Sequence, residues 1–163
     1  MEASNPRTLH VVPLSANAED GWRLSSPYVE RVWSEHLGPT ATLLARRLGR
    51  MLKERPGGLD VEFGDLATSL GVQPSIAVKA LERLNQFEVV YFAPQQFIVG
   101  VSGFAPSVDS ARLLRLSEGG RAVHERLVEE SEAPRSVRAV SGARAAVSRL
   151  SVPRVAPVQR RAL

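Results

Sequence analysis

Apolar residues in the middle of the chain recur mainly at the three-to-four-residue spacing of an amphipathic helix. In the first such segment this spacing places Val29, Val32, Trp33 and His36 on one face, and Gly38 and Pro39 end the helix. Proline and glycine also separate the later segments. The predicted helices span residues 28–37, 40–55, 63–70, 74–87, 107–116 and 117–130.

Alternating or β-branched runs predict the strands. The segment 59–63 (LDVEF) alternates as a short strand does, while 89–93 and 96–101 are β-branched and aromatic. The proline and glutamine between these two runs favour a hairpin. Near the start of the chain, TLHVVPL forms a strand only if another element offers it an edge.

The chain therefore divides into three parts. Residues 1–26 show no sustained period and are interpreted as a mostly flexible arm, and residues 27–131 form the folded domain. Residues 132–163 contain Pro, Ser, Gly, Arg and Ala with no aromatic residue. Such a segment buries too little apolar surface to offset its ordering entropy, so we expect a disordered arginine-rich tail.

Charge is distributed unevenly between these parts. The whole chain of 163 residues has a net charge of +4, but residues 132–163 alone carry +6 and residues 1–131 carry −2. The high isoelectric point thus belongs to the tail. There is no cysteine, no apolar run of membrane-spanning length, and no secretory signal pattern at the N-terminus. We expect a cytoplasmic protein that binds no membrane.

Residues 65–84, DLATSLGVQPSIAVKALERL, hold the most informative pattern. Two helical segments meet at a corner, with small Ala67 where they cross and Gly71 four residues later for a turn with positive φ. This arrangement, followed by the hairpin, resembles the winged helix-turn-helix family of DNA-binding domains over residues 28–130. Apolar residues stand where that family locks its helix pair together: Leu66, Leu70, Val72, Ala77 and Ala80.

A narrower resemblance rests on LGPTATLLARRLGRML ahead of the corner and LSEGGRAVHERLV after the hairpin. These segments look like those of small uncharacterised winged-helix proteins of high-GC Gram-positive bacteria and their phages. The resemblance implies a mainly α, α+β domain with a hairpin wing and extra terminal helices. It implies DNA binding in transcriptional control, with helix 74–87 as the recognition helix.

At 100° per residue, Ala77, Leu81 and Leu84 face inward on that helix, and the opposite arc is polar. Amide, hydroxyl and basic side chains are suited to base edges and phosphates, and arginines in the tail are suited to phosphates. Glu82 also lies on the arc and repels phosphate. The candidate DNA-binding residues are Gln73, Ser75, Lys79, Arg83, Gln86, Gln95, Gln96, Arg135, Arg138, Arg144 and Arg149.

Other interpretations stay open. A winged helix also serves as a protein-docking adaptor, here through Ile76 and Val78, which flank the arc, and on that hypothesis the partner belongs to the transcription or replication machinery. A third hypothesis is that the protein binds RNA through its tail alone. A second basic cluster on helix 40–55 is interpreted as a solvated face, and its members are Arg46, Arg47, Arg50 and Lys53.

The last two predicted helices carry more apolar surface than a peripheral element needs, which favours a homodimer. The apolar residues concerned are Leu113, Leu114, Leu116, Val123, Leu127 and Val128. No catalytic, phosphate-loop or metal-ligand spacing is present in the sequence, because the histidines are dispersed and cysteine is lacking. We therefore expect neither an enzyme nor a cofactor or metal.

Overall fold

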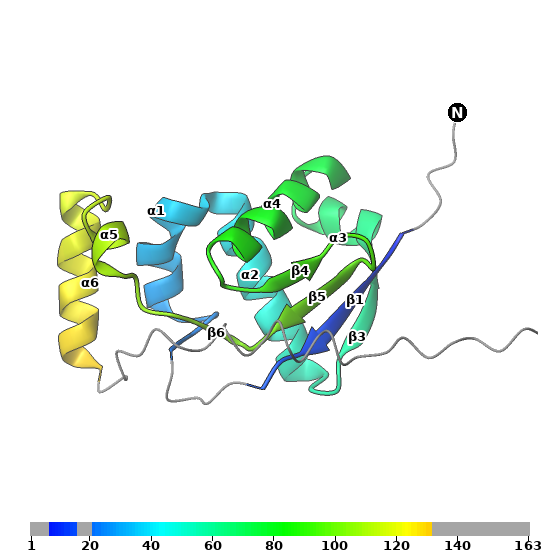
Figure 1. The fold of residues 1–163 in the computed structure, drawn as a ribbon, viewed down its shortest axis with the longest axis horizontal. Helices are drawn as coiled ribbons and strands as arrows, with labels where there is room; N and C mark the ends of the chain where they lie inside the picture. The colour runs from blue at the N-terminus through cyan, green and yellow to red at the C-terminus, as the bar shows by residue number, and fades with distance from the viewer. Residues whose placement is uncertain (1–6, 16–20, 132–163) are drawn as a thin grey trace, which may run out of the picture.

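The computed structural model of the chain describes residues 7–15 and 21–131 (Figure 1). The fold is α+β, with helices packed on a small four-stranded sheet and a separate two-stranded sheet. The predicted disordered tail, including Arg135, Arg138, Arg144 and Arg149, lies outside the described residues.

The helices follow the apolar periodicity closely, with a π-helix (η2) leading into α1. Gly38, with φ of 78°, separates α1 from α2, as the Gly-Pro pair predicts. The segment 107–116 forms only a four-residue helix, shorter than predicted. The helices are η2 (Val29–Trp33), α1 (Ser34–Leu37), α2 (Pro39–Glu54), α3 (Phe63–Ser69), α4 (Pro74–Gln86), α5 (Ser110–Leu113) and α6 (Glu118–Glu130).

The strands are β1 (Thr8–Pro13), β2 (Trp22–Arg23), β3 (Leu59–Glu62), β4 (Tyr91–Ala93), β5 (Ile98–Val101) and β6 (Phe104–Ala105). The larger sheet has the order β3-β1-β5-β4, and β2 pairs with β6. The predicted hairpin is confirmed, since β4 and β5 are antiparallel. The strand β1 lies between β3 and β5, antiparallel to the first and parallel to the second.

The interpretation of residues 1–26 as a mostly flexible arm is wrong for two of its segments. Strand β1 is central in the sheet and buries Leu9 and Val11, and Leu24 after β2 is buried as well. The reason is tertiary: β1 obtains its hydrogen bonds from β3 and β5, which lie far along the chain. Local sequence pattern carries no information about such partners. Residues 1–6 and 16–20 lie outside the described part.

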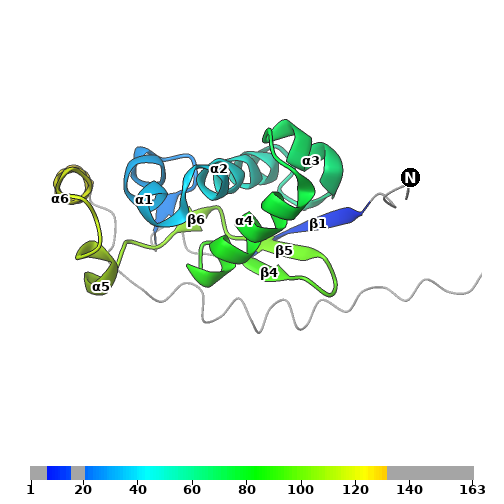
Figure 2. The same cartoon turned by 90° about the horizontal axis from the view of Figure 1, so that it is seen from above.

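The core lies between the larger sheet and the helices packed on it, and Figure 2 shows α2 and α3 on one side of the strands. Tyr28 and Trp33 are fully buried. Trp22 stacks on Tyr28 with ring centroids 4.0 Å apart, and the Trp33 indole donates to the Pro106 carbonyl at 2.7 Å. Burial raises the pKa of Tyr28 to about 12, so its hydroxyl stays protonated.

Helix α6 is attached to η2 and α1 by polar contacts at the end of the molecule opposite β1 and α3 (Figure 1). Ser117 caps the helix by accepting from the Gly120 amide, and its own amide and hydroxyl donate to Glu35. A side chain at position 120 would overlap the Glu35 carboxylate, which explains that glycine. Tyr28 and His124 share a hydrogen bond of 2.8 Å.

Most of the apolar surface that favoured a homodimer is used inside the chain. Leu116 is buried, whereas Leu114 is 76% exposed. The remaining members are partly buried against the core, and these are Leu113, Val123, Leu127 and Val128. Because only Leu114 of this set is exposed, the described residues give no support to the predicted homodimer.

Candidate nucleic-acid interface

Helices α3 and α4 meet at a tight turn whose geometry matches the sequence pattern. Gly71 has φ of 72°, a conformation that glycine adopts without steric cost. The Val72 amide donates to the Ala67 carbonyl at 3.1 Å, which closes the turn. Ala67 is fully buried where the helices cross, so a larger side chain would separate them. The predicted corner is confirmed.

One side of α4 is buried, as the periodicity predicts. Ala77, Leu81 and Leu84 are completely inaccessible, and Ala80 is buried beside them. Val78, however, is partly buried against the core, so the apolar edge proposed with Ile76 is reduced to Ile76 alone. The orientation of α4 is therefore fixed, and its other side is the surface available to a partner.

That other side of α4 presents polar side chains without internal partners. Gln73, Ser75, Lys79 and Gln86 are all exposed, and none makes a side-chain hydrogen bond or ion pair with any described residue. Long polar side chains held on a rigid helix but left unpaired are suited to an external polar ligand. Glu82 is exposed on the same side and is the only acidic residue of α4.

Arg83 departs from the prediction of a freely outward side chain. Its Nε and Nη2 atoms both donate to the His36 carbonyl oxygen, at 3.0 and 2.6 Å. The guanidinium also lies 5.6 Å from the Phe87 ring centroid. Sequence periodicity places the residue on the arc correctly, but it does not show that the end of α1 supplies an acceptor. Arg83 thus joins α4 to α1.

His36 lies beneath this contact and is 8% exposed, between the Trp33 and Phe87 rings. Burial, reinforced by the charge of Arg112, lowers the pKa of His36 below its usual value, so the ring is neutral at pH 7. Its Nε2 atom has no hydrogen-bond partner within the part of the chain that the structure describes. His36 is thus a packing residue, in agreement with its place on the apolar face of the first predicted helix.

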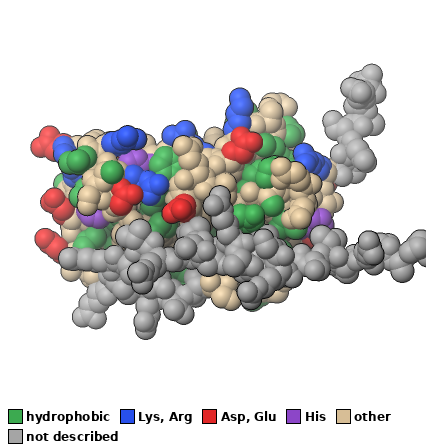
Figure 3. All heavy atoms as spheres, in the orientation of Figure 1, with side chains coloured by type: hydrophobic (Ala, Val, Ile, Leu, Met, Phe, Trp, Pro, Cys, Tyr) green, Lys and Arg blue, Asp and Glu red, His purple; other side chains and the backbone are tan. Residues whose placement is uncertain are grey.

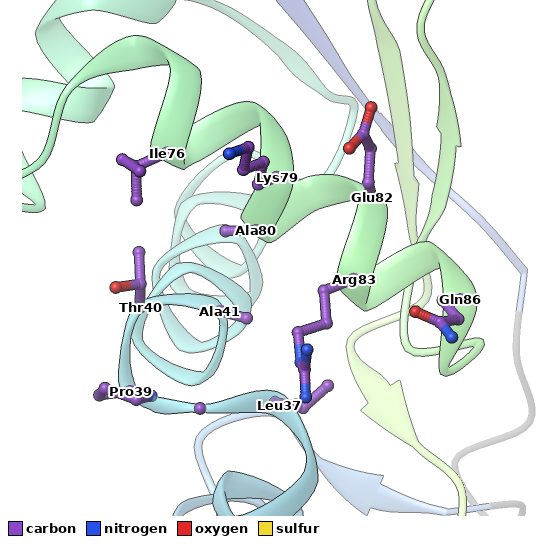
Figure 4. A pocket seen from close by; sticks show the side chains of 11 residues that line it. Leu37, Pro39, Thr40, Ala41, Ile76, Lys79, Ala80, Glu82, Arg83 and Gln86 are labelled. Carbon is purple, nitrogen blue, oxygen red and sulfur yellow. The ribbon is translucent and has the colours of Figure 1, made fainter.

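A groove of about 370 Å³ runs between α4 and the corner that joins α1 to α2. Figure 4 shows Ile76, Lys79 and Arg83 along one wall and Pro39 and Thr40 along the other. The floor is formed by small or apolar residues, including Ala41 and Ala80. The groove therefore combines an apolar floor with two cationic side chains on its rim.

The three arginines of the basic cluster on α2 have contacts within the chain, whereas Lys53 is exposed and its side chain has no partner among the described residues. Arg46 pairs with Glu30 and donates to the Ser26 carbonyl, and Arg47 donates to the Ser69 hydroxyl. Arg50 pairs with Glu54 one turn later. These contacts favour the interpretation of this cluster as a structural and solvated face.

The end of the β4–β5 hairpin contains Gln95 and Gln96, both exposed. Residues 94–96 carry no charge, but the structure places Arg7 against them. The Arg7 Nη2 atom donates to the Pro94 carbonyl at 3.1 Å. No local signal could have revealed this contact, because the two residues are 87 positions apart.

The charge distribution differs between the two ends of the molecule. Figure 3 shows Lys and Arg side chains along the upper margin, which in Figure 1 is formed by α1 as well as α4, and acidic side chains at the end formed by α6. In α6 the acidic residues outnumber the basic ones, and they are Glu118, Glu125, Glu129 and Glu130. A polyanion is therefore better accommodated along α4 than along α6.

No other chemistry is evident in residues 7–15 and 21–131. They contain no group of three or more His, Asp or Glu side chains placed to hold a metal ion. None of the helices in these segments is long and apolar enough to cross a bilayer. Searches of protein-family models, curated proteins and solved structures find no match to this chain.

Proposed function

We propose that this protein binds duplex DNA through the exposed side of α4 and acts in transcriptional control. The observation that carries the proposal is the set of unpaired polar side chains on that helix: Gln73, Ser75, Lys79 and Gln86. Because Ala77, Leu81 and Leu84 fix the opposite side in the core, these groups have a defined direction. A preorganised polar helix surface favours specific recognition over non-specific adhesion.

We interpret the fold as a winged helix-turn-helix domain. In this interpretation α3 and α4 form the helix-turn-helix, and β4 with β5 forms the wing. The chain has one distinctive feature, because β1 separates β3 from β5 in the sheet. The N-terminal strand is therefore an integral part of the domain that carries the proposed site.

In the proposed complex, α4 enters the major groove, which is wide enough for a helix. Gln73 and Ser75 stand at the N-terminal end of α4, where recognition helices contact base edges. Lys79 lies one turn further and contacts phosphate, and the arginines of residues 132–163 add sequence-independent contacts. Arg83 contributes chiefly by holding α4 to α1.

The two lysines of the chain allow a matched test. Lys79→Gln removes the free charge on α4, and Lys53→Gln removes an exposed charge on α2. Fluorescence anisotropy on a random-sequence duplex at low salt should show weaker binding for the first variant only. The salt slope of log K should fall by about 0.9 for one lost phosphate contact. Equal affinities of the two variants would contradict the proposal.

One observation favours a second function, that of a protein-docking adaptor. Ile76 is 42% exposed on the wall of the groove, near Pro39 on the other wall. An apolar residue in such a position suits a protein partner as well as a thymine methyl group. The adaptor hypothesis predicts that Ile76→Ser abolishes capture of a stoichiometric partner that survives nuclease treatment. The DNA hypothesis predicts that this change alters base preference.

A further inference from the structure

Arg7 is fixed at the end of the β4–β5 hairpin although it comes from the N-terminal segment. Its Nη2 atom donates to the Pro94 carbonyl at 3.1 Å, and its guanidinium carbon lies 3.7 Å from the centroid of the Phe97 ring. The backbone is held too, because the Phe63 amide donates to the Arg7 carbonyl at 2.9 Å. Two side-chain contacts and one backbone hydrogen bond thus position Arg7, whose side chain is otherwise exposed.

The ring beneath Arg7 is itself rigidly placed. Phe97 is buried and contacts the edges of Phe63 and Phe92, at centroid distances of 4.9 and 5.9 Å. Its backbone has φ of 54°, a left-handed conformation that the surrounding packing maintains. A guanidinium stacked on such a ring loses less freedom when it binds a ligand than a free side chain does.

The charge of Arg7 is not neutralised by the described residues. A guanidinium has five N–H donors, and one of those of Arg7 is directed to Pro94. No acidic side chain in residues 7–15 or 21–131 forms an ion pair with it. The hairpin end itself, residues 94–96, carries no charge, so Arg7 is the cation of this region.

We propose that Arg7 supplies the hairpin with its phosphate contact on duplex DNA. The proposal rests on the proposed function and extends the binding surface from α4 to a residue of the N-terminal segment. A planar guanidinium with free donors matches the geometry of phosphate oxygens. The strand β1 then has a functional reason to lie within the sheet, since it delivers this arginine to the hairpin end.

The test compares Arg7→Gln with Arg23→Gln in the full chain. Arg23 is a matched control, because it is exposed and lies over the Phe104 ring in the β2–β6 sheet, away from α4 in Figure 1. Anisotropy is measured on a random-sequence duplex over a salt series. We expect Arg7→Gln to bind about fivefold more weakly at low salt and to lower the salt slope by about 0.9.

Two further variants separate charge from packing. Arg7→Lys keeps the charge and should keep the wild-type salt slope, whereas Arg7→Met keeps an apolar contact with Phe97 and should show the reduced slope. Melting temperatures verify that each variant is folded. If Arg7→Gln unfolds, Arg7→Met provides the neutral variant for the same comparison.

The outcomes distinguish this proposal from the function on which it rests. If the wild type binds duplex DNA and both neutral Arg7 variants bind like Arg23→Gln, the contact by Arg7 is refuted while DNA binding stands. If the wild type binds no duplex at either end of the salt series, both proposals are overturned. A reduced slope confined to the neutral Arg7 variants supports the contact.

Discussion

Helices α2 and α4 both carry basic residues at the surface, but most of those on α2 have partners within the chain. On α2, Arg46 pairs with Glu30, Arg47 donates to Ser69 and Arg50 pairs with Glu54, whereas Lys53 has no partner among the described residues. On α4, Arg83 donates to the His36 carbonyl, and Lys79 contacts no acceptor among the described residues. The number of charges on a helix is therefore a poor guide to binding, and the partners of those charges are a better one.

The contrast has a physical basis in what surrounds each helix. Helix α2 is packed in the middle of the helical layer, close to η2, α1 and α4 (Figure 2). Arg46 and Arg47 consequently reach acceptors on neighbouring elements. Helix α4 is covered on one side only, and apart from Arg83 the polar groups proposed for binding on its open side find no acceptor among the described residues. Such groups are the natural contacts of an external ligand.

The largest expected effect is a difference in stability between variants on the buried side and the exposed side of α4. Leu81→Ala removes a completely buried side chain and should lower the free energy of unfolding by about 3 kcal/mol, because it leaves a cavity. Lys79→Ala should change it by less than about 0.5 kcal/mol. Urea denaturation of both variants measures the difference. If Lys79→Ala lost as much stability as Leu81→Ala, the exposed side of α4 would be needed for the fold and would not be free to bind a partner.

A smaller effect tests the structural role assigned to Arg83. Arg83→Ala removes both donors to the His36 carbonyl and should lower the free energy of unfolding by about 1–2 kcal/mol. The matched change Arg46→Ala, which removes an ion pair with exposed Glu30, should cost about 0.5 kcal/mol. If Arg83→Ala left the stability unchanged but bound DNA much more weakly, Arg83 would instead be a direct contact to DNA.

The smallest effect concerns pH and the buried His36 beside Arg83. The pKa of His36 is lowered by burial and by Arg112, so the unfolded chain binds the proton more readily than the folded one. Stability should therefore fall as the pH decreases through about 6.5, the usual histidine pKa. His36→Phe should flatten this dependence in thermal melts between pH 7 and 5, and an unchanged dependence would contradict the role assigned to His36.

Much of the fold follows from local sequence. The inward positions of α4, the Gly71 turn and the Ser117 cap each depend on residues within one or two turns of each other. The place of β1 in the sheet depends on residues some 50 and 90 positions away, as its pairings with β3 and β5 show. Periodicity cannot encode such partners, so the sequence predicts the strand of TLHVVPL only on the condition that an edge is available, and β3 and β5 supply that edge.

The same division holds for the candidate site. Sequence periodicity places Ser75, Lys79 and Gln86 on the open side of α4 correctly. It does not reveal that Arg83 turns back to the His36 carbonyl or that Arg7 stacks on Phe97. Both contacts join residues that are distant in sequence, and both alter which cations are available to DNA.

The central claim is that the folded part of the chain, and not only its basic tail, binds duplex DNA. Fluorescence anisotropy on a random-sequence duplex should compare residues 1–163 with residues 1–131 at low and physiological salt. We predict that both bind and that removal of the seven tail arginines only flattens the salt dependence. Loss of all binding with the tail would contradict the claim and would leave α4 as a protein-docking surface.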